Sequence, residues 1–103
     1  MDPIRSAFEN DPDMIDIVME FAAAFPERMA ALETCLAEGD LPKLQSLAHQ
    51  LKGAGGGYGF PQITEAAGSL EKVVKEGAEL SVIKEKLELL CEILRAVVVP
   101  EAD

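Results

Sequence analysis

The sequence is poor in basic residues, and it contains a single histidine and no tryptophan. Nine lysines and arginines stand against nineteen aspartates and glutamates, which gives a net charge of −10. Proteins that bind nucleic acids neutralise phosphate groups with clustered lysine and arginine side chains. This charge therefore argues against DNA or RNA as a partner.

Long apolar segments are also missing. No apolar run approaches the length of about 20 residues that a helix needs to cross a bilayer. The N-terminus lacks the basic and then apolar pattern of a secretory signal. We therefore predict no membrane insertion and a cytoplasmic location.

Only two cysteines are present, and each lies among leucines at helical spacing. We expect Cys35 and Cys91 to be buried, reduced thiols that behave as small apolar residues, rather than a disulfide. Because neither cysteine stands close to the other or to the histidine in the sequence, a zinc site is not expected.

The length of 103 residues suits one domain spanning residues 1–103. It leaves room for a modest core, but not for a nucleotide-binding kinase domain as well. The glycine-rich stretch at 53–59 lacks the Gly-x-x-x-x-Gly-Lys-Ser/Thr pattern that cradles the phosphates of a nucleotide. We therefore expect no autonomous kinase activity.

Apolar residues recur at helical spacing along most of the chain, and no segment alternates as a strand does. The first predicted helix starts with Asp11 as its N-cap and Pro12 in its first turn. Pro26 should break or kink this helix near Phe25, because proline removes a backbone donor and clashes with the preceding turn. A second helical segment then ends at Gly39, a typical C-terminal cap.

Three further helices are predicted after Gly39. Asp40 caps a helix over 41–58, a fourth helix runs from Pro61 to about residue 77, and the last runs from about residue 81 to Pro100. Helices of this length with short connections pack as an antiparallel up-and-down bundle. We therefore predict an all-α fold: a four-helix bundle with an additional N-terminal helix that covers one end.

The only histidine, His49, belongs to the polar side of the helix over 41–58. At about 100° per residue it points roughly 140° away from Leu44, which lies on the apolar side with Leu47, Ala48 and Leu51. Its neighbours one turn away are Gln45, Lys52 and Gly53, with Gly56 beyond. The imidazole should therefore face solvent beside one ammonium group, on a surface with little side-chain bulk.

Four glycines lie between residues 53 and 57, and each costs about 1 kcal/mol against alanine inside a helix. One interpretation is close helix packing or a loop that begins near Gly53. The other is that bulk is excluded around His49 so that a large partner can reach it. We favour the second interpretation for Gly53 and Gly56, and give it less weight for Gly55 and Gly57.

The run from His49 to Gly59 resembles the signature of histidine-containing phosphotransfer (HPt) domains. The matching residues are His49, Leu51, Lys52, Gly53 and the later Gly59, and the resemblance extends to the pair Leu70-Glu71 in the following helix. It implies a phosphorelay intermediate, in which His49 accepts a phosphoryl group from an aspartate of a response-regulator receiver domain and passes it to another receiver domain. One of these receivers could belong to a hybrid histidine kinase.

The resemblance also implies roles for the neighbouring residues. Nε2 of His49 would carry the phosphoryl group, Lys52 would supply positive charge, and Glu71 would hold Nδ1. Gln45, Gly53 and Gly56 are the candidate docking residues. The magnesium ion that such transfers require is expected in the receiver domain, since this chain shows no compact carboxylate cluster near His49 and should hold no metal or cofactor of its own.

Two alternatives for the function remain open. The chain could be a non-transferring adaptor or antagonist bundle, although His49 and Lys52 are both present. It could also be the phospho-accepting part of a larger sensor kinase; its initial Met1 and acidic end favour a free-standing protein, which we expect to be monomeric. Tyr58 and Phe60 could extend the docking surface, but core packing is favoured for at least one of them.

Overall fold

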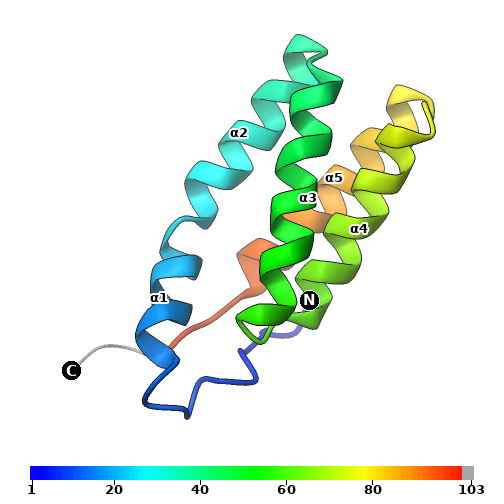
Figure 1. The fold of residues 1–103 in the computed structure, drawn as a ribbon. Helices are drawn as coiled ribbons and strands as arrows, with labels where there is room; N and C mark the ends of the chain where they lie inside the picture. Colours follow the sequence, from blue (N-terminus) through cyan, green and yellow to red (C-terminus); the bar gives the residue numbers. More distant parts are fainter. Residues whose placement is uncertain (101–103) are drawn as a thin grey trace.

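A computed structural model of the chain describes residues 1–100. Figure 1 shows its five α-helices, which are α1 (Ile15–Ala23), α2 (Phe25–Glu38), α3 (Leu41–Gly57), α4 (Pro61–Lys75) and α5 (Leu80–Ala96). No strand forms within residues 1–100, so the predicted all-α class is confirmed. The predicted domain also included residues 101–103, which lie outside the described residues.

The helices form an elongated up-and-down bundle with principal extents of 44 × 23 × 19 Å. In Figure 1, α1 and α2 follow one another along one side, α3 returns beside α2, α4 runs back against α3, and α5 closes the bundle. The most extensive contact between two helices is that of α3 with α4. The bundle with an additional N-terminal helix is therefore present as predicted.

Each long helix buries one apolar stripe in a common core, as amphipathic helices do. Burying a leucine or isoleucine side chain contributes about 1.5–3 kcal/mol, so these stripes hold the bundle together. The fully buried large side chains, drawn from all five helices and the turn before α4, are Val18, Leu32, Leu44, Leu51, Phe60, Ile63, Leu70, Ile83 and Leu90.

The helical conformation is interrupted between α1 and α2 at Ala24, two residues before Pro26. The predicted interruption near Phe25 is therefore confirmed. Below the break, Phe21 of α1 stacks on Tyr58 with ring centroids 4.4 Å apart and also lies against Phe25. The N-terminal helix thus packs against the lower end of α3, where it helps to close one end of the bundle.

Two predicted helix ends are wrong. Asp11 is not the N-cap of α1, because its carboxylate accepts from the amide of Asp13 within a turn, and the helix begins only at Ile15. The last helix ends at Ala96 rather than at Pro100. The cause is a long-range backbone pairing with Ile4. The amide of Ile4 donates to the carbonyl of Ala96 (2.9 Å), and the carbonyl of Ile4 accepts from the amide of Val98 (2.9 Å).

The N-terminal segment also ties down the turn between α3 and α4. The buried hydroxyl of Ser6 donates to the Tyr58 carbonyl at 2.6 Å, and the amide of Ala7 donates to the Gly59 carbonyl at 2.9 Å. Gly59 has a φ of +85° and leaves no room for a side chain. Both the backbone conformation and the close neighbours therefore require glycine at this position.

We predict that Gly59→Ala destabilises the fold much more than Gly77→Ala. Gly77 also has a positive φ, of +71°, but an added Cβ would meet nothing within 4 Å, so alanine there should cost only the conformational penalty of about 1–2 kcal/mol. At Gly59 the Cβ would lie 2.5 Å from Ser6 Oγ and 2.7 Å from the Ala7 nitrogen, which should raise the total to about 2–5 kcal/mol. Urea unfolding of both variants measures the difference, and equal losses would contradict the account of the N-terminal segment.

Candidate functional site

His49 lies on the outer side of α3, and its side chain is 70% exposed. Leu44, Ala48 and Leu51 of the same helix are buried, as the helical wheel predicts. The imidazole turns one nitrogen toward α4, where Nδ1 lies 2.7 Å from Oε2 of Glu71. The predicted contact between Glu71 and Nδ1 is therefore present in the structure.

The second oxygen of Glu71 contacts the other basic residue of the site. Oε1 lies 3.3 Å from Nζ of Lys52, one turn along α3 from His49. The aliphatic part of Lys52 passes over Gly68 of α4, where an added Cβ would lie 3.6 Å from Lys52 Cδ. Sequence reasoning missed Gly68, although its place one turn before Glu71 put it on the same helix face.

Glu71 lies in an environment that favours its charged form. Desolvation raises the pKa of this carboxyl, but the hydrogen bonds from His49 and Lys52 and the positive charge of both groups together lower it below its ordinary value of 4.5. An ionised Glu71 can only accept hydrogen bonds. The neutral imidazole must therefore carry its proton on Nδ1 to make this contact, which leaves the lone pair of Nε2 free.

The glycines of α3 fall into two groups. A Cβ added at Gly53 or Gly57 would meet nothing within 4 Å, and one at Gly56 would meet only Thr64 Oγ1 at 3.5 Å. A Cβ at Gly55 would lie 2.8 Å from Thr64 Oγ1 and 2.9 Å from the Thr64 nitrogen. Gly55 therefore permits close packing of α3 on α4, whereas the other three form an open glycine surface beside His49.

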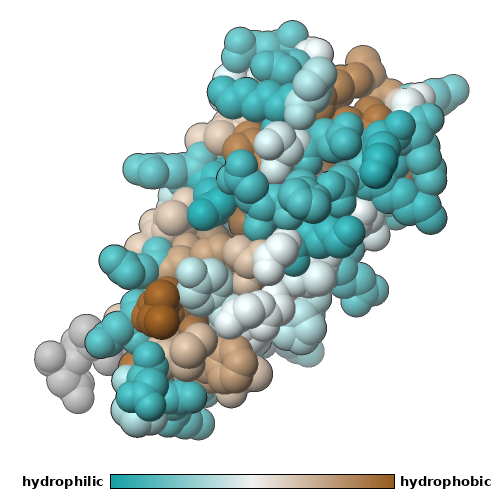
Figure 2. All heavy atoms as spheres, viewed as in Figure 1, coloured by the Kyte–Doolittle hydropathy of each residue, from teal (hydrophilic) through white to brown (hydrophobic). Residues whose placement is uncertain are grey.

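The remaining candidate docking residues divide in a similar way. Gln45 lines a shallow hollow together with His49 and Glu71, so it borders the site. Phe60 is fully buried in the core, and Tyr58 is partly buried and packs against the core, where it stacks on Phe21. Figure 2 shows the face that carries α3, with hydrophilic residues gathered at the upper end and paler residues over the lower half of the helix.

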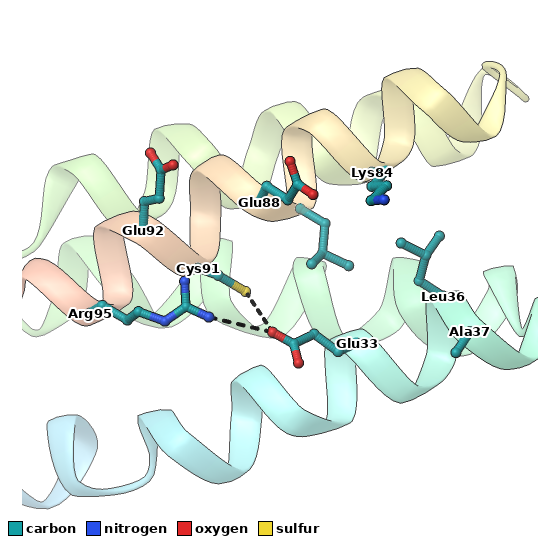
Figure 3. Close-up of a pocket in the computed structure, with 9 residues that line it drawn as sticks. Glu33, Leu36, Ala37, Lys84, Glu88, Cys91, Glu92 and Arg95 are labelled. Atoms are coloured by element: carbon teal, nitrogen blue, oxygen red, sulfur yellow. Dashed lines mark hydrogen bonds and ion pairs between the residues drawn. The ribbon is translucent and has the colours of Figure 1, made fainter.

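A larger hollow than the one at His49 lies between α2 and α5 (Figure 3). Glu33 of α2 meets two residues of α5 there, since its Oε1 lies 3.6 Å from a guanidinium nitrogen of Arg95 and 4.0 Å from Sγ of Cys91. Desolvation and the nearby Glu33 charge raise the pKa of the Cys91 thiol. Both cysteines are buried and free, as predicted.

Within residues 1–100, no group of three or more histidine, cysteine, aspartate or glutamate side chains is arranged to hold a metal ion. In the same range, no helix is long and apolar enough to cross a membrane. A receiver domain as the source of magnesium stays a prediction.

Comparison with protein families matches residues 16–98 to the Hpt domain, and this match spans most of the chain and all of α3 and α4. The chain belongs to the Hpt domain family. The resemblance drawn from the run around His49 is thereby confirmed, and so is involvement in histidine phosphotransfer in two-component signalling, with receiver domains as the class of partner. Comparisons with curated proteins and with solved structures gave no match.

We predict a pH-dependent effect of Glu71→Gln on the stability of this Hpt domain. Because the folded-state pKa of Glu71 is lowered, the carboxylate stabilises the fold fully above its unfolded-state pKa and loses this contribution as the pH falls through the lowered value. The variant should therefore melt slightly below the wild type at pH 7, and the two melting temperatures should converge once the pH falls below the lowered pKa of Glu71. Circular dichroism melting across this range tests the prediction, and a difference that widens on acidification would contradict it.

Proposed function

We propose that this Hpt domain is a phosphorelay intermediate that accepts a phosphoryl group on His49 from a receiver-domain aspartate and passes it to another receiver domain. The observation that carries the proposal is the 2.7 Å contact between Nδ1 of His49 and the Glu71 carboxylate. It commits one ring nitrogen to the protein and leaves Nε2, on a side chain that is 70% exposed, as the acceptor.

The transfer step follows from this tautomer. The Nε2 lone pair attacks the phosphorus atom of the aspartyl phosphate in line, and the bond from phosphorus to the aspartate oxygen breaks, so that a carboxylate leaves. The imidazole ring then carries a positive charge, because Nδ1 keeps its proton. The Glu71 carboxylate faces that charge directly and stabilises it. Transfer to the next receiver domain reverses these bond changes.

Lys52 completes the charge balance of the site. In the unphosphorylated protein its ammonium contacts Glu71 at 3.3 Å. Once the imidazole ring becomes cationic, Glu71 has a second positive partner, and Lys52 can turn toward the phosphoryl oxygens one turn from its own place on α3. Such positioning and charge neutralisation are what phosphoryl transfer chiefly requires of a protein.

The open glycine surface supports a receiver domain as the partner. Gly53, Gly56 and Gly57 let a large protein approach α3 closely, with Gln45 at the border. We propose that the receiver domain brings the magnesium ion and that this chain acts without kinase activity of its own. A cytoplasmic location and a monomeric state also remain proposals.

The direct test is transfer of label from phosphorylated receiver domains to the purified chain. The wild type should take up the phosphoryl group, and His49→Gln should take up none. Because His49 is mostly exposed, the substitution should change the free energy of unfolding by less than about 0.5–1 kcal/mol. Absence of transfer from every receiver domain of the same cell would favour the adaptor function instead.

We predict that Gly53→Leu blocks this transfer, whereas Gly53→Ala slows it little. Nothing lies within 4 Å of a Cβ at this position, and both substitutions raise helix propensity by about 0.5–1 kcal/mol, so neither should harm the fold. Leucine adds bulk where the partner must approach, and we expect a loss of at least about tenfold in transfer rate, or 1.4 kcal/mol.

Glu85→Leu, at an exposed position of α5, controls for the addition of a leucine to the surface. It should transfer at the wild-type rate. A normal rate for Gly53→Leu would mean that the glycine surface is not part of the interface.

A further inference from the structure

Thr64, in the first turn of α4, makes two hydrogen bonds to the backbone of α3. Its hydroxyl donates to the carbonyl of Lys52 at 2.8 Å and accepts from the amide of Gly56 at 2.8 Å. In a regular α-helix these two groups are each other's partners, since an amide donates to the carbonyl four residues earlier. The hydroxyl therefore lies between the donor and the acceptor of one backbone pair in α3.

This contact depends on the absence of a side chain at Gly55. A Cβ there would lie 2.8 Å from Thr64 Oγ1, 2.9 Å from the Thr64 nitrogen and 3.0 Å from Ile63 Cβ. Two of these atoms belong to the rigid start of α4, so they could not move without shifting the helix. Gly55 and Thr64 are therefore matched: the glycine admits the hydroxyl, and the hydroxyl uses the space.

Thr64 shares a face of α4 with the residues that meet His49 and Lys52. Gly68 and Glu71 follow it by four and seven residues, which places all three within about 60° of one another on the helix. Along this stripe, α4 contacts first the backbone of Lys52, then its aliphatic part, and finally its ammonium together with the imidazole of His49. This face of α4 thus lies along Lys52 and His49 of α3.

The hydrogen bonds of Thr64 are the contacts of this stripe that are best suited to fix how α4 is placed along α3. Apolar contacts between the two helices are non-directional and tolerate small displacements. A hydroxyl held between a carbonyl and an amide tolerates little, because both hydrogen bonds weaken as distance and angle change. Glu71 lies about 10 Å further along α4, and an axial displacement of about 1 Å would disturb its 2.7 Å bond to His49.

We infer that Thr64 is a positioning residue for the phosphotransfer site: its hydroxyl fixes the register of α4 on α3 and thereby holds the Glu71 carboxylate at Nδ1 of His49. Thr64 itself touches no atom of His49. The consequence for transfer rests on the proposed function, but the consequence for the imidazole tautomer does not.

The test compares Thr64→Val, which replaces the hydroxyl with a methyl group, and Thr64→Ser, which keeps the hydroxyl. His49 is the only histidine, so ¹⁵N NMR of ring-labelled protein reports its tautomer without overlap. Wild type and Thr64→Ser should hold the proton mainly on Nδ1. Thr64→Val should show a larger fraction protonated on Nε2 and a transfer rate lower by about tenfold or more.

A purely structural role of Thr64 would have a different outcome. In that case Thr64→Val would lower the melting temperature but keep the wild-type tautomer and transfer rate, and this result would overturn the inference. If wild type takes no phosphoryl group from any receiver domain, the proposed function fails, and the tautomer comparison still decides the role of Thr64.

Gly55→Ala provides a second variant, in case Thr64→Val does not fold. It leaves the hydroxyl in place chemically but forces the start of α4 away from α3, because its Cβ needs the space of Thr64. The same shift of the tautomer toward protonated Nε2 is expected. An unchanged tautomer in folded Gly55→Ala would overturn the inference as well.

Discussion

The contact between Glu71 and His49 is the interaction on which the proposed function of this Hpt domain depends. It joins α3 to α4 across 22 residues of sequence and decides which ring nitrogen faces a partner. It does not hold the bundle together, since hydrogen bonds and ion pairs among exposed side chains add little to stability. The apolar core carries the fold, the fold fixes how α4 lies on α3, and that arrangement gives the carboxylate its place.

The glycines of α3 reveal a conflict between helix stability and access to the site. Each glycine inside a helix costs about 1 kcal/mol, so this end of α3 is weak by local propensity alone. Packing offsets the cost, because Gly55 lets α4 approach closely and Thr64 binds the backbone of the same turn. The outward glycines stay uncovered, which leaves His49 open to a large partner.

Apolar periodicity predicted the five helices, the break before Pro26 and the exposed position of His49, because these depend on local spacing and on proline chemistry. Family resemblance supplied the contact of Glu71 with Nδ1. The end of the last helix was wrong because Ile4, far away in sequence, pairs with the chain after Ala96. Thr64, Gly68 and the packing role of Gly55 were missed for a related reason, since they follow from the register of two helices and leave no periodic pattern in either one.

The most direct test of the central claim is to identify which nitrogen of His49 carries the phosphoryl group. ¹⁵N and ³¹P NMR of the chain, phosphorylated by a receiver domain with its imidazole labelled, distinguish phosphorylation at Nε2 from phosphorylation at Nδ1. The contact with Glu71 predicts a phosphoryl group on Nε2 and a proton on Nδ1. A phosphoryl group on Nδ1 would contradict the account, because Nδ1 could then not be bound to the Glu71 carboxylate.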